Sequence, residues 1–324
     1  MAVLRIPVEL QQMYDSDPEV FLRDIANFPQ ETVLRYFKSV KNIYKSVKRS
    51  ITNSFDFDTH EFNKDFKCNS PYSRYLHFDL SLGGDLCAFS MAHAPSFVEV
   101  NRLEQGNLVS YKLPYICVDF VGIMLVGAKE EVWLPRIPEI VSELSDRGFP
   151  ISLITFDRFQ SAYIMQLLKD EGYLTDILSI DRTSHKVLID MSIKDNPIKR
   201  ESTKGNYLAA MASLRDAVLQ ERIEIPYHKA VRIKTAESQF EVEAKAAQYY
   251  PDKKKVDHGS GGTIDLLQAV AGAVFNVECN ERSFVVDDDL LRKAGDTFYS
   301  RLYSGFKETE DFGRGGSTHE SYLG

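Results

Sequence analysis

One stretch of the sequence limits the possible folds most strongly: two apolar runs, residues 75–82 and 86–93, are joined through Gly83-Gly84. In the second run the side chains alternate between two sets, Leu86, Ala88 and Ser90 in one and Cys87, Phe89 and Met91 in the other. Alternation with a period of two is typical of a β-strand, and Gly-Gly is a favoured connection in a tight hairpin. The sequence therefore predicts a β-hairpin, with Asp79 inside its first strand.

Asp79 stands where an acid is costly. A carboxylate that is buried in a sheet destabilises the fold unless it is paired, hydrogen-bonded or bound to a metal ion. Two interpretations are open at this point. The acid either holds a metal ion, or it caps the turn or faces solvent from an edge strand.

Strands and helices alternate after the hairpin. The β-branched run 114–126 predicts a long strand, and residues 151–156 and 174–180 predict two shorter ones. Between them lie two predicted helices, residues 136–147 and 158–171, each of which is followed by a glycine. This order indicates an α/β fold, in which helices cover a mixed β-sheet.

The N-terminal part looks different. Residues 30–50 predict an amphipathic helix, and residues 51–73 predict a loop or linker. The polar face of the helix carries four lysines, Lys38, Lys41, Lys45 and Lys48. This face is either a solvated surface or a contact with a phosphate backbone.

The remaining chain completes the expected organisation. Residues 181–202 are polar and irregular, while residues 204–221, 236–250 and 263–277 predict helices. Residues 303–324 are poor in apolar side chains and predict a disordered tail. We therefore expect an N-terminal segment over residues 1–73, a folded domain over 74–302 and a flexible tail over 303–324.

Composition excludes several classes of protein. A net charge of −8 does not fit a protein that coats nucleic acid with its whole surface, although local basic patches remain compatible with it. No apolar run approaches the roughly 20 residues that span a bilayer, and the N-terminus does not resemble a secretory signal. The four cysteines form no Cys-x-x-Cys pair, and no Gly-x-x-x-x-Gly-Lys-Ser/Thr phosphate loop occurs. We expect a cytoplasmic protein without an ATPase motor.

Two further acids stand at positions that suit a shared site. Asp157 follows a predicted strand at its carboxyl end, where open α/β sheets place ligands, but Asp is also a favoured N-cap for a following helix. Asp265 lies in the first turn of a predicted helix, on one face with Gln268 and Gly272. The helix dipole keeps Asp265 ionised, which suits a metal ligand and an ordinary first-turn acid alike. We expect the opposite, apolar stripe to pack on the sheet and Asp265 to turn toward the sheet's edge.

Together with their neighbours, these acids resemble the motifs of a known family, the large terminase subunits of tailed phages. Residues 6–10, 17–19 and 21–25 resemble the segment that follows the ATPase domain in that family. The three nuclease motifs of the family are similar to residues 75–93 with Asp79 and Asp85, to residues 155–161 with Asp157, and to residues 255–274 with Asp265. Residues 178–182 also fit, and the resemblance covers nearly all of residues 3–278. One departure is Gln268, which stands where many members of the family have a second Asp.

The resemblance implies a ribonuclease H-like fold and a metal-dependent endonuclease that cleaves double-stranded viral DNA during genome packaging. Two Mg²⁺ or Mn²⁺ ions, roughly 3.5–4 Å apart, would activate the attacking water and stabilise the leaving oxygen. The implied ligands are Asp79, Asp157 and Asp265, with Asp85 as a further candidate. The implied partners are DNA, the terminase ATPase domain, the small terminase subunit and the portal, with no membrane, in the cytoplasm of the host.

Alternatives remain for the function and for the third ligand. Because Gln268 replaces an acid, the chain could instead be a non-catalytic docking module of the packaging motor, and a junction resolvase on the same fold is a third option. Asp257 and the run 287–289 compete with Asp265 for the third position. For binding DNA, we single out Lys253, Lys254 and Lys255.

Overall fold

The computed structural model of the chain describes residues 6–7, 10, 35–80, 87–104, 107–124, 135–157, 161–180, 184–194, 197–206, 208–259, 262–281 and 284–285. The chain divides into two compact units, which are residues 1–96 with 115–281 and residues 97–114 with 282–324. Asp85, the run 287–289 and the predicted tail lie outside the described residues.

The larger unit is built on a mixed sheet with the strand order β1-β9-β4-β3-β2-β5-β6. The strands are β1 (Val47–Thr52), β2 (Arg74–Asp79), β3 (Cys87–Glu104), β4 (Asn107–Met124), β5 (Ile151–Asp157), β6 (Thr175–Ile177) and β9 (Ile223–Tyr227). β2 pairs antiparallel with β3 and parallel with β5, and β5 pairs parallel with β6. The predicted hairpin, with Asp79 in its first strand, therefore forms the centre of the sheet.

The order β4-β3-β2-β5-β6 is that of a ribonuclease H-like sheet, in which a run of antiparallel strands is extended by parallel strands on the other side of the first. The parallel strands are reached through α4 (Arg136–Asp146) and α5 (Ala162–Asp170). Parallel neighbours need such crossover helices, whereas antiparallel neighbours need only a turn. The predicted α/β fold class with a ribonuclease H-like mixed sheet is confirmed.

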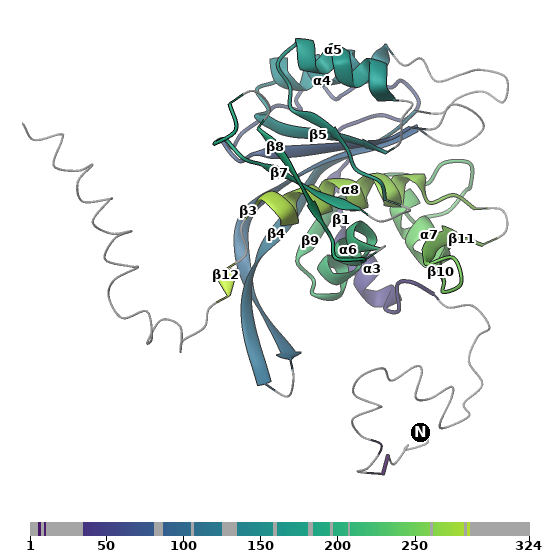
Figure 1. Cartoon of the computed structure of the whole chain (residues 1–324). Helices are drawn as coiled ribbons and strands as arrows, with labels where there is room; N and C mark the ends of the chain where they lie inside the picture. The colour runs from purple at the N-terminus through teal and green to yellow at the C-terminus, as the bar shows by residue number, and fades with distance from the viewer. Residues whose placement is uncertain are drawn as a thin grey trace, which may run out of the picture. The chain divides into compact units, whose positions relative to one another are not determined.

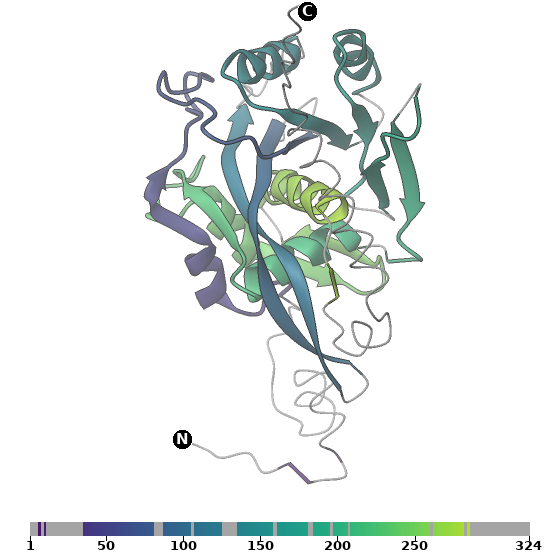
Figure 2. The same ribbon diagram turned by 90° about the vertical axis from the view of Figure 1, so that its left-hand side faces the viewer.

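Helices cover both faces of this sheet (Figures 1 and 2). α4 and α5 lie on one face, while α8 (Asp265–Asn280) lies against the other, together with α6 (Ala209–Leu219), α7 (Gln239–Ala246) and α3 (Val40–Ser46). Two separate apolar clusters fill the two sides. None of the helices within the described ranges is long and apolar enough to cross a membrane.

Alternation along β2 decides which side chains reach which face. Leu76 and Phe78 belong to the aromatic cluster under α4 and α5, where the Phe78 ring stacks on Phe156 with the ring centres 5.2 Å apart. Tyr75 belongs to the cluster on the α8 side. Since successive side chains of a strand point to opposite faces, His77 and Asp79 also point to the α8 side.

Three predicted segments differ from the structure. The N-terminal helix is shorter than expected, because the chain turns at Val47 into β1, which pairs with β9 and joins the larger unit. The segment expected to be irregular contains a hairpin, β7 (His185–Ile189) with β8 (Ile198–Ser202). The helix expected to reach residue 250 ends at Ala246, and the chain continues into β10 (Ala247–Tyr250), which pairs with β11 (Lys255–His258). Each of these strands has only four to six residues, and patterns of that length do not separate a strand from a helix or an irregular segment.

The smaller unit contains the outer part of the β3–β4 hairpin. β12 (Phe284–Val285) pairs antiparallel with β4 there, with Phe284 opposite Lys112. The guanidinium of Arg102 lies 5.5 Å from the centre of the Tyr111 ring.

Candidate active site

Asp79 and Asp157 are the last residues of β2 and β5, and they are register partners in this parallel pair. Neighbouring strands lie about 4.8 Å apart, and partners in a parallel pair project to the same face. Only 9% of Asp79 and 2% of Asp157 is exposed. The structure thus brings two carboxylates side by side, nearly out of contact with solvent, at the carboxyl edge of the sheet.

A buried polar seam joins the same two strands to α8 one step earlier. His77 and Thr155 are register partners, and the Nδ1 atom of His77 lies 2.8 Å from the Thr155 Oγ1 atom. The side-chain amide of Asn276 on α8 donates to the same oxygen at 2.7 Å. Gly272 lies against the His77 ring, so closely that a Cβ atom there would stand 2.2 Å from two ring atoms. The seam fixes α8 against β2 and β5.

The seam also relates the first turn of α8 to the strand acids. Asp265 precedes Gly272 by seven residues, which is about 10 Å of helix, and Asp79 follows His77 by two strand residues, which is about 7 Å. Because Gly272 and Asn276 contact His77 and Thr155, α8 lies on the face of the sheet to which Asp79 and Asp157 also point.

The prediction that the apolar stripe opposite Asp265 packs on the sheet is wrong. The face of Asp265 itself, with Gly272 and Asn276, contacts the sheet, and α8 is also packed against α6. All residues of α8 from Leu266 to Val277 except Gln268 are buried. A helix that is covered on both sides carries apolar side chains all around, so periodicity no longer indicates which face meets the sheet.

The local environment of Asp265 includes a residue that sequence reasoning missed. The Thr263 hydroxyl donates to Asp265 Oδ2 at 2.9 Å, and the backbone N–H of Asp265 donates to the Thr263 oxygen at 3.3 Å. Glu243 on α7 is 1% exposed and accepts the backbone N–H of Leu267 at 2.7 Å. Burial raises the pKa of Glu243 to about 8, and the charge of Asp265 also acts to raise it. Nothing in the sequence around Glu243 marks it, because its partners at the start of α8, Thr263 and Leu267, lie 20 and 24 positions away.

Asp157 has a hydroxyl partner that the sequence did not single out as functional. Ser179, just after β6, donates from its Oγ atom to Asp157 Oδ1 at 3.2 Å. The Ser184 hydroxyl donates in turn to the Ser179 carbonyl at 2.6 Å. Ser179 lies within the residues 178–182 that also fit the family resemblance, which is the only signal that could have pointed to it.

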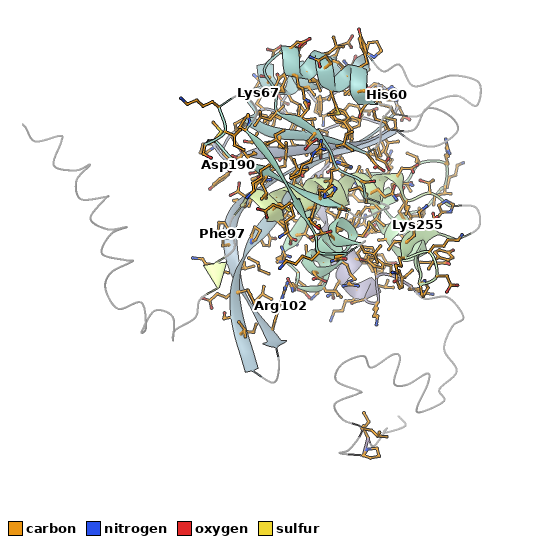
Figure 3. The ribbon with its side chains drawn as sticks, viewed as in Figure 1. His60, Lys67, Phe97, Arg102, Asp190 and Lys255 are labelled. Carbon is orange, nitrogen blue, oxygen red and sulfur yellow. The ribbon has the colours of Figure 1, made fainter. Side chains whose placement is uncertain are left out.

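The competing third ligand and the lysines lie on a different element. Asp257 is in β11, where the Lys255 ammonium lies 2.9 Å from its Oδ2 atom. Hydrogen bonds from Lys255 and from the backbone N–H of His258 outweigh partial burial and lower the pKa of Asp257. Figure 3 labels Lys255 on this strand, beside α7. The Lys253 ammonium lies over the Tyr250 ring, 5.8 Å from its centre. Asp257 is therefore an ion-paired acid, and it does not lie on β2, β5 or α8.

The carboxylates suit a hard divalent cation. Mg²⁺ and Mn²⁺ prefer carboxylate oxygens, and two acids in register on neighbouring strands are a donor set of that kind. Within the ranges that the structure describes, no three His, Cys, Asp or Glu side chains converge closely enough to hold one metal ion together. Asp79 and Asp157 are the pair in place, and the participation of Asp265 stays a prediction.

Comparison with known proteins gives similar solved structures. No protein-family model matches the chain, and no curated protein matches its sequence. The large terminase of bacteriophage HK97 aligns with 85% of this chain at 13% identity and a TM-score of 0.42. This chain spans 51% of the length of that protein.

The nuclease of the large terminase from the thermophilic phage G20c, solved with bound magnesium, is also similar. It aligns with 76% of this chain and 98% of its own length, at 11% identity and a TM-score of 0.43. The same nuclease in a second structure gives 10% identity and a TM-score of 0.40, over 74% of this chain and 95% of its own length. The similar structures are large terminases. At these values of identity and TM-score, we rest the function on the chain's own acids.

Proposed function

We propose that this chain is a metal-dependent endonuclease that cleaves double-stranded DNA, of the kind found in the large terminase subunits of tailed phages. The observation that carries the proposal is the register of Asp79 and Asp157, which places two buried carboxylates side by side on the face where α8 begins. Two adjacent like charges in a region of low exposure repel each other, and a bound cation removes that repulsion.

In the proposed reaction, Asp79 and Asp157 would hold the metal from the sheet, and Asp265 would join them from the first turn of α8. Bound Mg²⁺ or Mn²⁺ supplies a nucleophilic hydroxide at neutral pH and stabilises the charge on the phosphate and the leaving oxygen. The Ser179 hydroxyl orients the Asp157 carboxylate through its hydrogen bond, and the Thr263 hydroxyl does the same for Asp265. The His77 seam beneath them keeps the strands and α8 in their relative places.

The proposed setting follows from the resemblance noted in the sequence. The partners would be the terminase ATPase domain, the small terminase subunit and the portal, and the protein would act in the cytoplasm of the host during genome packaging. Contact with DNA would be to the phosphate backbone, without a preferred sequence, because the sequence contains no motif that reads a groove.

The test is the conversion of supercoiled plasmid to nicked and linear forms. We expect cleavage with Mg²⁺ and more with Mn²⁺, since Mg²⁺ demands stricter octahedral geometry, and no cleavage with EDTA. Asp157→Asn should abolish cleavage, and Asp257→Asn is the matched control that should keep it. Intact plasmid with both metals would leave the docking module as the function, and cleavage confined to branched DNA would favour the resolvase.

A further inference from the structure

α8 begins without a cap of its own. Its N-cap residue is Ile264, whose side chain cannot accept a hydrogen bond, and no side-chain cap is made there. The first four N–H groups of a helix have no acceptor within the helix and need one from elsewhere. The start of α8 is almost completely buried, so water is not available to the N–H groups of Leu266 and Leu267.

Glu243 supplies the missing acceptor from a different helix. Its Oε2 atom accepts the Leu267 N–H at 2.7 Å, in the first turn of α8, and its Oε1 atom accepts the side-chain amide of Gln239 at 2.8 Å. The Thr263 hydroxyl lies 3.5 Å from the same Oε1 atom. Because this acceptor comes from α7, it fixes the start of α8 relative to α7 and also satisfies the Leu267 N–H.

Thr263 connects this cap to the acid of the candidate site. Its single hydroxyl hydrogen faces Asp265 Oδ2 at 2.9 Å and Glu243 Oε1 at 3.5 Å, and the shorter contact takes it. The hydroxyl oxygen also accepts the Asp265 backbone N–H. Glu243 thus holds the backbone of the first turn through Leu267, and Thr263 holds the side chain of Asp265 on that turn.

We propose that Glu243 is a positioning residue for Asp265: by holding the first turn of α8, it sets where the Asp265 carboxylate lies relative to Asp79 and Asp157. This inference rests on the proposed function, because it assigns Glu243 a task only if Asp265 binds the metal. Residues behind a metal ligand typically change metal affinity by about 10-fold to 100-fold when they are removed.

The chain offers a matched control within α7 itself. Glu241 is fully buried like Glu243, but it caps α7 through Ser238 and accepts two contacts of 2.7 Å from Arg49. No hydrogen bond links Glu241 to α8 among the contacts of the described residues. Loss of either acidic side chain should lower stability, but only loss of Glu243 should disturb Asp265.

The experiment compares Glu243→Ala, Glu243→Gln and Glu241→Gln in the full chain. Manganese affinity is measured by electron paramagnetic resonance titration, cleavage by kcat and KM, and folding by Tm. Glu243→Ala should weaken Mn²⁺ binding by about 10-fold or more and lower kcat, with little change in KM for DNA. Glu243→Gln keeps an acceptor for the Leu267 N–H, so its Mn²⁺ affinity should stay within about 3-fold of wild type. That range is too small to count as loss of a positioning contact. Glu241→Gln should lower Tm while leaving Mn²⁺ affinity unchanged.

A second pair covers the case in which Glu243→Ala does not fold. Thr263→Val removes the hydroxyl and should weaken Mn²⁺ binding, and Thr263→Ser should restore it. Wild-type Mn²⁺ affinity in both Glu243→Ala and Thr263→Val, with only Tm lowered, would overturn the inference. A different result separates this inference from the proposed function. If Glu243→Ala weakens the Mn²⁺ binding of the wild type but neither protein cleaves DNA, the positioning role of Glu243 is supported and the nuclease function is contradicted.

Discussion

The two ends of β2 differ in the signs of the charges that are buried there. At its start, Arg74 is 1% exposed, and its Nε atom lies 3.2 Å from Asp119 Oδ2, which also lies 3.0 Å from His93 Nδ1. At its end, Asp79 has as its register partner a second acid, Asp157. The strand therefore begins in a buried pair of opposite charges and ends in a buried pair of like charges.

The difference separates structure from function. A buried charge is tolerated when a partner of opposite sign accompanies it, as for Arg74 with Asp119. Two acids in register repel each other, and a bound cation relieves that repulsion, so such an arrangement favours a site for binding or catalysis. A buried pair of opposite charges indicates a structural contact of the fold, and a buried pair of neighbouring acids indicates the candidate site.

The largest expected effect compares one carboxylate from each end. Asp119→Asn leaves Arg74 buried without its counter-charge and should lower the free energy of unfolding by about 3–5 kcal/mol. Asp157→Asn removes one of two like charges and should leave the free energy of unfolding unchanged or raise it. Urea unfolding followed by circular dichroism in EDTA measures both. An equal loss of free energy of unfolding in the two variants would contradict the difference between the two ends of β2.

His228 adds a third case to the comparison, a buried titratable group that is neutral. His228 is buried, its Nδ1 atom lies 2.9 Å from the Pro226 carbonyl, and its Nε2 atom accepts the Phe240 N–H at 3.2 Å. Burial lowers the pKa of His228 from 6.5 to about 4, so the unfolded chain takes up the proton first. The stability is therefore fully present above pH 6.5 and is lost as the pH falls toward 4, by about 3 kcal/mol.

The measurement is the free energy of unfolding at pH values between 4 and 7. Because other groups titrate in this range, the quantity to compare is the difference between wild type and His228→Gln, which should have the flatter dependence. Parallel curves for the two proteins would contradict the assignment to His228.

A substitution at Gly272 tests the seam that holds α8 beside the end of β2 where Asp79 and Asp157 lie. In Gly272→Ala the new Cβ atom meets the His77 ring, so we expect a loss of about 1–3 kcal/mol and a lower kcat as α8 shifts. Gly262→Ala is the matched control, because its nearest contact is an ordinary 3.5 Å. Adding His77→Ala should relieve the clash, and a double-mutant cycle without coupling would show that the ring and the glycine do not meet.

The smallest effect concerns the lysines before and within β11. Replacing Lys253, Lys254 and Lys255 by Ala should weaken DNA binding equally for all sequences and reduce the salt slope by about 0.9 for each phosphate that a lysine no longer neutralises. Lys255 is engaged with Asp257, so Lys255→Ala alone should change the slope by less than the triple variant. Fluorescence anisotropy across a salt series gives the slopes, and an unchanged slope in the triple variant would place these lysines away from DNA.

The sequence predicted the sheet from local patterns and the two strand acids from their positions at strand ends. Alternation in residues 75–93 and the glycine stops after two helices were sufficient for the order of elements around β2 and β5. What could not be predicted lies in contacts between distant parts of the chain. Glu243 caps a helix that begins 22 residues later, counted from 243 to 265, and β1 is a strand because β9 is beside it. Neither fact leaves a periodic pattern near the residues concerned.

The register of β2 and β5 has a consequence for how such a chain can change over evolution. Asp79 and Asp157 meet only because each strand has the right number of residues after His77 and Thr155. Insertion or deletion of one residue in either strand would turn one acid into the aromatic cluster around Phe78 and Phe156. The tip of the β7–β8 hairpin carries none of the acids of the candidate site, and Met191 near this tip is 79% exposed. In chains that share this site, we expect differences in length at that tip and none within the two strands.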